Sequence, residues 1–521
     1  MSADSPRESR IPDRAPPLQG AALGLLTLAI AFSTFMEVLD ITIVNVSVPA
    51  IAGSLGVSPY EGTWAISSYS LASAIMQPLT GWLARRFGEV RTFVTSVSLF
   101  VVFSMLCGFA TSMPMLVLFR LLQGVVSGPM VPLSMTLLLS NYPDAKKGLA
   151  LALWAMTVVI APIFGPVLGG YITDNYSWPW IFFINVPVGL GAAMVTYFLL
   201  RGRESAIVRQ PIDAIGLGLL VIGVGSLQFM LDNGNNKDWF ASPLILTLGI
   251  VAVVALTFLV AWELTDRHPI VDLTLFRHRN FATGTIALAI GMFGFFGINV
   301  VYPLWLQTTL GYTALWAGYA TAPVGILAFL LSPLIGRNIQ RLELRAVASF
   351  AFVVFAFTAF WFSRFTVDAS FSDLILPRLI QGIGIACFFI PVNQIILSGL
   401  KPHEIASASG LSNFFRTIAG SVSTAVTVTL WSQRGDYHHA VLAEHVNMAN
   451  AGAVSFLDKL QALGAPTLPS YAIVDSVVTQ QAMTLAVNDV FWLFGWMFLL
   501  MIPLLWLARP PFGNAGAKAV H

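Results

Sequence analysis

Long apolar runs follow one another along almost the whole chain, and their length limits the folds open to it more than any other feature. A helix that crosses a bilayer needs about 20 mostly apolar residues. Fourteen runs meet this requirement, namely 20–47, 60–83, 90–111, 113–138, 148–172, 179–200, 211–231, 241–263, 281–307, 314–336, 345–365, 373–398, 405–431 and 487–507. Backbone groups find no partners in hydrocarbon, so spanning segments must be helices or closed barrels. Runs of this length predict an all-α polytopic membrane protein with 14 transmembrane helices.

The composition agrees with this interpretation. Hydrophobic residues make up 56% of the 521 and charged residues only 10%, whereas a soluble domain is about one quarter charged. The net charge of +2 gives no reason to expect a nucleic-acid partner, and the expected surroundings are the lipid bilayer. Cys107 and Cys387 both lie inside apolar runs, so neither a disulfide framework nor a thiolate metal site is indicated.

Basic residues gather in alternate loops, and this bias predicts the orientation. Of the 27 Lys and Arg residues, 20 fall in the two tails and in the loops on the same side as the tails. Cytoplasmic loops of membrane proteins carry such an excess. Both termini are therefore expected in the cytoplasm, which requires an even number of spans.

The chain also repeats itself weakly, because LFRLLQG at 118–124 matches LPRLIQG at 376–382. A parallel repeat of this kind is typical of transporters built from two similar halves. We expect a cytoplasmic tail at 1–19, a six-helix half at 20–200, two inserted helices with linkers at 201–280, a second six-helix half at 281–507 that includes an external loop at 433–485, and a cytoplasmic tail at 508–521.

Several charged residues lie deep inside apolar runs. Glu37 and Asp40 are three residues apart on one face of the first run. A charge at mid-membrane costs about 2.5–3.5 kcal/mol on insertion scales, so a partner is expected. Arg120 in the fourth run lies at a depth comparable to that of Asp40 and is the candidate. The alternative is that Arg120 extends to the headgroups while Asp40 faces a wet cavity unpaired.

Arg416 lies near the middle of the thirteenth run. Three roles suit it: binding an anionic ligand group, balancing an acid in the other half, or binding backbone carbonyls. Arg378, in the repeat of the Arg120 segment, is shallower and is expected to be structural, and Asp489 is expected at the membrane interface.

Several segments in a fixed order carry a family resemblance. They are GWLARRFG at 81–88, LVLFRLLQG at 116–124, APIFGPVLGG at 161–170 and WPWIFFINVPVG at 178–189, together with LDITIVNVSVP in the first run. With them the chain resembles the major facilitator superfamily, in particular its fourteen-span drug/proton antiporter branch, over nearly its whole length. The resemblance implies two six-helix halves plus two inserted helices.

The resemblance also implies roles for single residues. Arg120 and Gln123 match the motif linked to proton coupling, and Asp40 fits the first-span motif. Glu37 is not a fixed part of that motif, and three interpretations of it stay open: a proton relay step, a contact for a cationic substrate, or a protonated group without a role in transport. Glu37, Asn45, Asn413 and Arg416 are the expected substrate or cavity residues.

The fifth run matches the antiporter motif, which keeps the two halves tightly joined. Its residues here are Pro162, Gly165, Pro166, Gly169 and Gly170. A kinked packing helix with closely spaced glycines would give the same pattern on physical grounds alone. The loop at 81–88 departs from the family, because Arg85 stands where an acid of a cytoplasmic latch is usual.

The implied function is proton-driven export of lipophilic small molecules by alternating access between the halves. No GxxxxGK[ST] loop is present and all seven histidines lie in loops or tails, so we expect no ATP site, no metal, no cofactor and no enzymatic activity, with the proton gradient as energy source. His438, His439 and His445 are more simply a solvated cluster than a metal site.

The branch resembled is that of inner-membrane components of tripartite exporters. This implies a bacterial inner-membrane location, a periplasmic adaptor protein of the EmrA type and, through it, an outer-membrane channel of the TolC type. The loop at 433–485, in which LDKLQALG suggests a short amphipathic helix, is the expected docking surface. Two alternatives stay open: export of an endogenous metabolite such as a siderophore or fatty acid, and a membrane receptor or assembly subunit that transports nothing.

Overall fold

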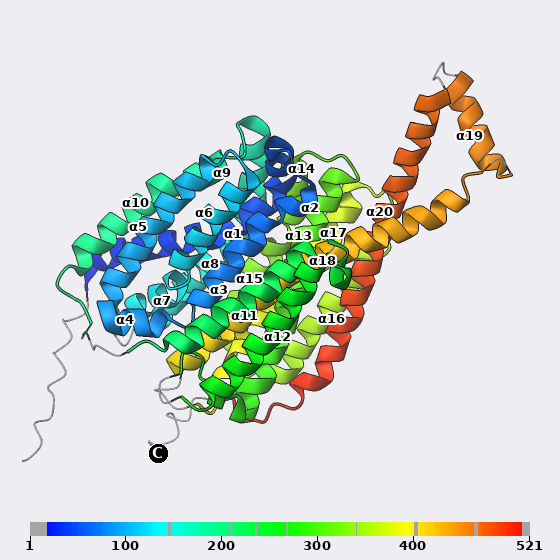
Figure 1. Cartoon of the computed structure of the whole chain (residues 1–521). Coiled ribbons are helices and arrows are strands. Elements are labelled where there is room, and N and C mark those ends of the chain that lie inside the picture. The colour runs from blue at the N-terminus through cyan, green and yellow to red at the C-terminus, as the bar shows by residue number, and fades with distance from the viewer. Residues whose placement is uncertain are drawn as a thin grey trace, which may run out of the picture.

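The computed structural model describes residues 18–143, 147–205, 207, 211–234, 237–266, 269–339, 341–400, 405–447, 449–462 and 467–512. Throughout these ranges the regular elements are helices (Figure 1). The predicted all-α membrane fold is confirmed.

The helices of the first part of the chain are α1 (Gly20–Leu55), α2 (Pro59–Gly62), α3 (Trp64–Met76), α4 (Thr80–Phe87), α5 (Glu89–Gly108), α6 (Met113–Ser127), α7 (Met130–Asn141), α8 (Lys147–Asn175), α9 (Trp180–Phe183), α10 (Asn185–Leu200), α11 (Ala214–Asn233) and α12 (Pro243–Glu263). Those of the second part are α13 (Arg279–Thr308), α14 (Ala314–Thr321), α15 (Val324–Asn338), α16 (Leu344–Phe362), α17 (Phe371–Leu397), α18 (Ile405–Glu444), α19 (Ala451–Ala462) and α20 (Thr467–Leu505). Short 3-10 helices lie at Trp239–Ala241 and Leu273–Arg277.

Eleven helices within the described residues are long and apolar enough to cross a bilayer. The three other predicted spans, at 60–83, 148–172 and 405–431, coincide with α3 and α4, with α8 and with α18. Fourteen crossings and cytoplasmic termini stay predictions. We call the end of the bundle where α1, α8 and α11 finish the outer end, because the charge bias predicts that it faces outward.

The predicted end of the first span at residue 47 is wrong for the helix itself. Helix α1 passes through Pro49 and ends at Leu55, where Gly56 adopts a left-handed conformation with φ of 68°. Glycine takes this conformation without strain and commonly ends helices. The hydrophobic run fades before the helix ends because its last turns lie near the predicted membrane surface.

The segment predicted as an external loop at 433–485 is mostly helical. Helix α18 continues to Glu444 and α20 begins at Thr467, so both extend well past the ends predicted at 431 and 487. In Figure 1 these extensions (orange) and α19 leave the bundle together as one projection. At its base the Asp489 carboxylate accepts hydrogen bonds from Arg434 Nε at 2.6 Å and from His438 Nε2 at 2.8 Å. We call the described residues of 433–485 the projection.

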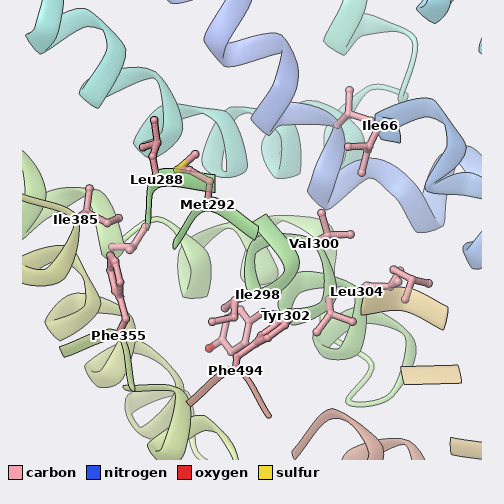
Figure 2. Packing of buried hydrophobic residues seen from close by; sticks show 14 of the residues in the cluster. Ile66, Leu288, Met292, Ile298, Val300, Tyr302, Leu304, Phe355, Ile385 and Phe494 are labelled. Atoms are coloured by element: carbon pink, nitrogen blue, oxygen red, sulfur yellow. The ribbon is translucent and has the colours of Figure 1, made fainter. Parts of the chain in front are cut away.

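The apolar interior is continuous across both parts of the chain. Figure 2 shows some of it around α13, where Ile298 and Tyr302 lie near Phe494 of α20, and Phe355 of α16 lies near Ile385 of α17. A second group of buried side chains fills the first six-helix part, with Phe93 and Phe100 of α5 among its largest members.

Helices α11 and α12 form a hairpin that lies at the front of the bundle in Figure 1. They pack closely on each other, since a Cβ atom at Gly223 would approach Leu256 Cδ2 to 2.8 Å. Side chains of α12 such as Val253 and Phe258 are exposed apolar groups, as expected for a face in lipid. Helix α11 also contacts α3 from the first half and α18 from the second.

Candidate functional site

A buried ion pair lies at the centre of the first half. Arg120 of α6 donates from Nη1 to Asp40 Oδ2 of α1, and the two side chains are 1% and 0% exposed. Because the pair is closed to solvent, each charge depends on the other for its stability. The partner expected from depth is therefore the one that Asp40 contacts, and neither side chain reaches the surface.

Two amides complete the coordination of the Asp40 carboxylate. Asp40 Oδ1 accepts from Gln123 Nε2 at 3.3 Å and from Asn185 Nδ2 at 3.0 Å. Gln123 Oε1 in turn accepts from Arg120 Nη1 at 2.8 Å, so the three residues of α1 and α6 form a closed ring. Helices α1, α6 and α10 thus converge on one carboxylate.

Sequence reasoning missed Asn185. It lies inside the segment WPWIFFINVPVG, and its presence as a lone amide in an apolar run was the available signal. Its Nδ2 also donates to Ser104 Oγ at 3.0 Å, and Ser104 donates to the Phe182 carbonyl at 2.9 Å. The network therefore extends from α1 through α10 to α5.

The guanidinium of Arg120 is held in place from two further directions. Its Nε donates to the Ala65 carbonyl of α3 at 2.9 Å, and its Cζ lies 4.1 Å from the centre of the Tyr69 ring. Helix α6 can approach α3 this closely because Gly124 has no side chain, and a Cβ there would lie 2.8 Å from Ala72 Cβ. A fixed cation stabilises the carboxylate in one position.

The second half contains a matching arrangement without the acid. Arg378 of α17 donates to Gln381 Oε1 at 2.8 Å, as Arg120 does to Gln123, and its Cζ lies 4.7 Å from the Tyr302 ring centre. Its Nη2 also donates to Asn299 Oδ1 of α13 at 3.1 Å. Asn299 follows Asp40 by 259 positions, close to the offset of the sequence repeat. The repeat thus preserves the arginine and replaces the carboxylate with a neutral amide.

Glu37 lies one turn before Asp40 and is 3% exposed. Its Oε2 has no hydrogen-bond partner among the described residues. Arg416 of α18 lies within electrostatic range of Glu37, so an acid of the first half faces a cation of the second. Of the three roles considered for Arg416, this arrangement favours the balance of an acid.

The other expected cavity residues lie in the same two helices. Asn45 of α1 is buried, and its Oδ1 is likewise without a hydrogen-bond partner among the described residues. Asn413 of α18 accepts through its carbonyl from Thr417, whose hydroxyl also bonds Gln77 at 3.2 Å across to the first half. The polar groups of α1 and α18 therefore mark the boundary between the halves.

The glycines of the predicted antiporter motif lie in α8 at two close helix contacts. A Cβ at Gly165 would meet the Thr42 side chain, and one at Gly169 would lie 2.6 Å from the Ile43 carbonyl oxygen. Gly170 faces α14, where a Cβ would lie 2.5 Å from Leu315 Cα. In return, Gly318 of α14 packs on the Pro166 backbone. Pro162 lies in α8 too, with a side chain outside the described ones.

A carboxylate adds a polar contact at the same boundary. Asp174, at the outer end of α8, accepts from the Leu315 backbone N–H at 2.8 Å. This N–H belongs to the first turn of α14 and has no partner within that helix. The first half therefore caps a helix of the second.

Arg85 is exposed in the last turn of α4, where a cation suits the helix dipole. An acid does contact the segment just after this loop, namely Glu204, which follows α10. Its carboxylate accepts from the Val90 N–H at 2.9 Å and from the Arg91 N–H at 3.0 Å. These contacts join two elements of the same half.

The described residues contain no group of three or more His, Cys, Asp or Glu placed to hold a metal ion. His438 binds Asp489, His439 binds Asp475 at 3.1 Å, and His445 bonds the Val441 carbonyl. Each histidine of the projection thus has a separate partner.

Comparisons with known proteins identify the family of the chain. A family model described as "Major Facilitator Superfamily" matches residues 30–424. The "Multidrug export protein EmrB" of Escherichia coli K12 is 49% identical over 501 residues, covering 96% of this chain and 98% of that protein. The "Fatty acid resistance protein FarB" of Neisseria gonorrhoeae is 48% identical over 501 residues, with 96% and 99% covered.

Solved structures show the same fold at low identity. The crystal structure of a D-xylose-proton symporter aligns with a TM-score of 0.61 at 15% identity, covering 94% of this chain and 99% of that one. An auto-inhibited peptide transporter of the POT family aligns with a TM-score of 0.62 at 13% identity, covering 95% and 98%.

Replacing Arg120 with methionine is expected to destabilise the protein strongly, because it leaves the Asp40 carboxylate buried without its cation. The expected loss is on the order of 3–5 kcal/mol. The double variant Asp40→Asn/Arg120→Met should recover much of it, since no charge then remains at the site. Thermal unfolding of the purified protein in detergent measures both.

Arg378→Met is the matched control, because the partners of Arg378 are neutral amides. We expect a smaller loss of stability than for Arg120→Met. Equal losses in the two single variants, or a double variant no more stable than Arg120→Met, would contradict the ion pair as the source of the effect.

Gly170→Ala is expected to destabilise the contact between the halves by about 1–3 kcal/mol, because the new Cβ meets the α14 backbone, which cannot rotate away. Gly191→Ala in α10 is the control, since no atom lies within 4 Å of a Cβ there. Alanine is the better helix former, so the control should be neutral or slightly stabilising. A thermal unfolding comparison in which Gly170→Ala matches Gly191→Ala would rule out tight packing at this position.

Proposed function

The chain belongs to the major facilitator superfamily, and on that premise we propose that it is a proton-coupled antiporter that exports lipophilic drugs or other toxic compounds. It is a multi-pass protein of the bacterial inner membrane. Transport proceeds by alternating access, in which the two six-helix halves rock about the boundary formed by α1, α3, α8, α14 and α18. The relative named as a multidrug export protein supports the same class of cargo.

One observation carries the proton-coupling part of the proposal: the carboxylate of Asp40 is buried against a fixed arginine. Protonation of Asp40 removes its negative charge and with it the electrostatic attraction to Arg120. The gain or loss of one proton therefore changes the relative energy of two arrangements of α1 and α6. A proton can shift a conformational equilibrium only through such a difference in binding between states.

Gln123 and Asn185 have a supporting role in this step. Their amide groups donate to Asp40 Oδ1 in the ionised state. When the carboxyl group is protonated, these amides remain and keep it in the same position. Asp40 then exchanges its proton at a fixed place, while Arg120 is retained by the Ala65 carbonyl and the Tyr69 ring.

Glu37 is the second acid of the cycle. It shares a helix face with Asp40 and faces Arg416, which belongs to the other half. The charge on Glu37 therefore acts across the boundary that must open and close. Because the two acids lie one turn apart on the same helix, we assign them one combined function in proton uptake and release.

The proton gradient is the energy source of the proposed cycle, without a bound cofactor. The transporter family and the missing phosphate-binding loop both support transport rather than an enzymatic reaction. The family and the buried acids likewise speak against a receptor or assembly subunit that transports nothing.

A second candidate cargo is a fatty acid or another endogenous metabolite with an acidic group. The relative named for fatty acid resistance supports it, and so does Arg416, a cation at the boundary between the halves. A fatty acid would present a carboxylate to Arg416 in competition with Glu37. Growth of a deletion strain with added long-chain fatty acids, compared with growth in the presence of lipophilic cations, separates the two cargo classes.

The projection is the proposed docking surface for a periplasmic adaptor of the EmrA type, and through it for an outer-membrane channel of the TolC type. It extends α18 and α20 beyond the rest of the outer end, and the contacts of Asp489 hold its base. Exposed apolar side chains such as Phe456 and Tyr471 suit a protein partner.

Asp40→Asn is expected to reduce proton-driven efflux by about tenfold or more, because the amide has no proton to exchange. Substrate counterflow, which needs no net proton movement, should persist in the same variant. Both are measured in proteoliposomes with a fluorescent lipophilic cation. Asp373→Asn, at an exposed helix cap, is the control and should retain both activities. Full gradient-driven efflux by Asp40→Asn would refute the assignment.

A photo-crosslinking side chain at Phe456 is expected to capture the adaptor protein in cells that express both. The same side chain at exposed Thr366, in another outer loop, is the control and should give no product. The products are identified by immunoblotting for the adaptor. Equal capture from both positions, or none from Phe456, would contradict docking on the projection.

A further inference from the structure

Asp232 is a half-buried acid that the transport cycle proposed above does not use. It lies in the last turn of α11, in the inserted hairpin, just past the predicted end of that span. Its Oδ2 accepts from Ser67 Oγ of α3 at 2.8 Å, and its Oδ1 accepts from Gln228 Nε2 at 3.0 Å. The carboxylate therefore binds the first half and also orients a neighbour on its own helix.

The backbone of Asp232 strengthens the same attachment. Its carbonyl accepts from Trp64 Nε1 at 3.1 Å and from the Tyr60 hydroxyl at 2.8 Å. Both donors come from the α2–α3 region at the outer end of the first half. With Ser67 they make three side chains of one half that bind a single residue of the hairpin.

The second half reaches this place through α18. Gln228 Nε2, held by Asp232, also lies 3.4 Å from the Ser421 carbonyl oxygen. The Ser421 hydroxyl donates to the Ser67 carbonyl at 3.0 Å, and Tyr60 Oη lies 3.3 Å from Thr429 Oγ1. Residues of α3, α11 and α18 thus meet in one polar cluster at the boundary between the halves.

The attachments of the hairpin to the two halves are unequal. Towards α2 and α3 the hairpin presents a carboxylate and a carbonyl that accept hydrogen bonds at 2.8–3.1 Å. Towards α18 it presents one amide contact at 3.4 Å. Hydrogen bonds to a charged group are the stronger kind. When the halves separate at the outer end, the hairpin is therefore expected to stay with α3 and to release α18.

We propose that the inserted hairpin is a strap that holds the outer end closed, and that Asp232 is the positioning residue that anchors it. The inference rests on the alternating-access function proposed above and adds a role for the two helices outside the repeated halves. Asp232 fixes α11 on α3 and presents Gln228 to α18. Loss of the carboxylate frees Ser67 and Gln228 together, so it weakens the attachment of the hairpin to both halves.

The opposite end of the hairpin provides a matched control. Asp213 Oδ1 accepts from the Gly216 N–H at 2.8 Å and from Trp262 Nε1 at 3.0 Å. It is an acid of the same hairpin, but Gly216 belongs to α11 and Trp262 to α12. Neither partner therefore lies in one of the two halves. Asp213→Ala therefore loosens the hairpin without touching the boundary between the halves.

The experiment measures the separation of the halves directly by double electron–electron resonance. Spin labels are placed on cysteines at Ser54 and Thr366, which are exposed at the outer ends of the two halves. Native Cys107 and Cys387 are buried, so labelling is selective. In Asp232→Ala we expect the ratio of closed to open distances to fall about tenfold relative to the unsubstituted protein. Asp213→Ala should leave the ratio unchanged.

Ser67→Ala and the double variant Ser67→Ala/Asp232→Ala test the contact itself. If Asp232 acts through Ser67, the double variant should shift the ratio little more than Asp232→Ala alone. An unchanged distance distribution in correctly folded Asp232→Ala, or an equal shift in Asp213→Ala, would overturn the strap. The measurement needs no substrate and no proton gradient. The strap can therefore be refuted while drug efflux is upheld, and drug efflux can be refuted while the strap is upheld.

Discussion

The buried pair of Asp40 and Arg120 is the interaction on which the rest of the first half depends. Charges removed from water are costly, and they persist only where every remaining lone pair and N–H group is satisfied. Five helices meet that requirement together: α1 supplies the acid, α6 the arginine and Gln123, α3 a carbonyl and an aromatic ring, α10 Asn185, and α5 the serine that fixes Asn185. Displacement of any one of these helices leaves a charged group partly unpaired. In the proposed cycle, protonation of Asp40 therefore affects the contacts of all five helices.

The second half repeats the arrangement of arginine, glutamine and aromatic ring but lacks the negative charge of an acid. Arg378, its glutamine three residues later and its aromatic neighbour repeat the pattern around Arg120, but Asn299 stands where the repeat would place an acid. A neutral amide accepts a hydrogen bond from the arginine and does not titrate in the physiological range. The two halves thus share the same packing around an arginine, while only the first pairs this arginine with an acid. In the proposed cycle, this division makes the first half responsive to protons and gives the second half a fixed charge.

The sequence was sufficient for the features that follow from hydrophobicity and depth. Apolar runs long enough to span a bilayer predict the helices. The cost of a lone charge in lipid predicts that Asp40 pairs with Arg120. The glycines of α8 were also predictable, because closely spaced small residues indicate close helix contact. Asn185, Asn299 and Asp232 could not be assigned in the same way, since a single polar residue in an apolar run does not identify its partner on another helix. The lengths of α1, α18 and α20 were missed because a helix that leaves the membrane loses its hydrophobic signal and not its hydrogen bonds.

The boundary between the halves combines two kinds of contact with different consequences for motion. At α8 and α14, glycine backbones pack so closely that the surfaces fit in one register only, and Asp174 caps the facing helix. At α3, α11 and α18 the contact is polar, and its donors and acceptors can exchange partners as the helices separate. Tight apolar packing resists leakage, whereas exchangeable hydrogen bonds lower the cost of opening. An antiporter needs both, because a boundary made only of packed glycines would not open, and one made only of polar groups would admit protons without cargo.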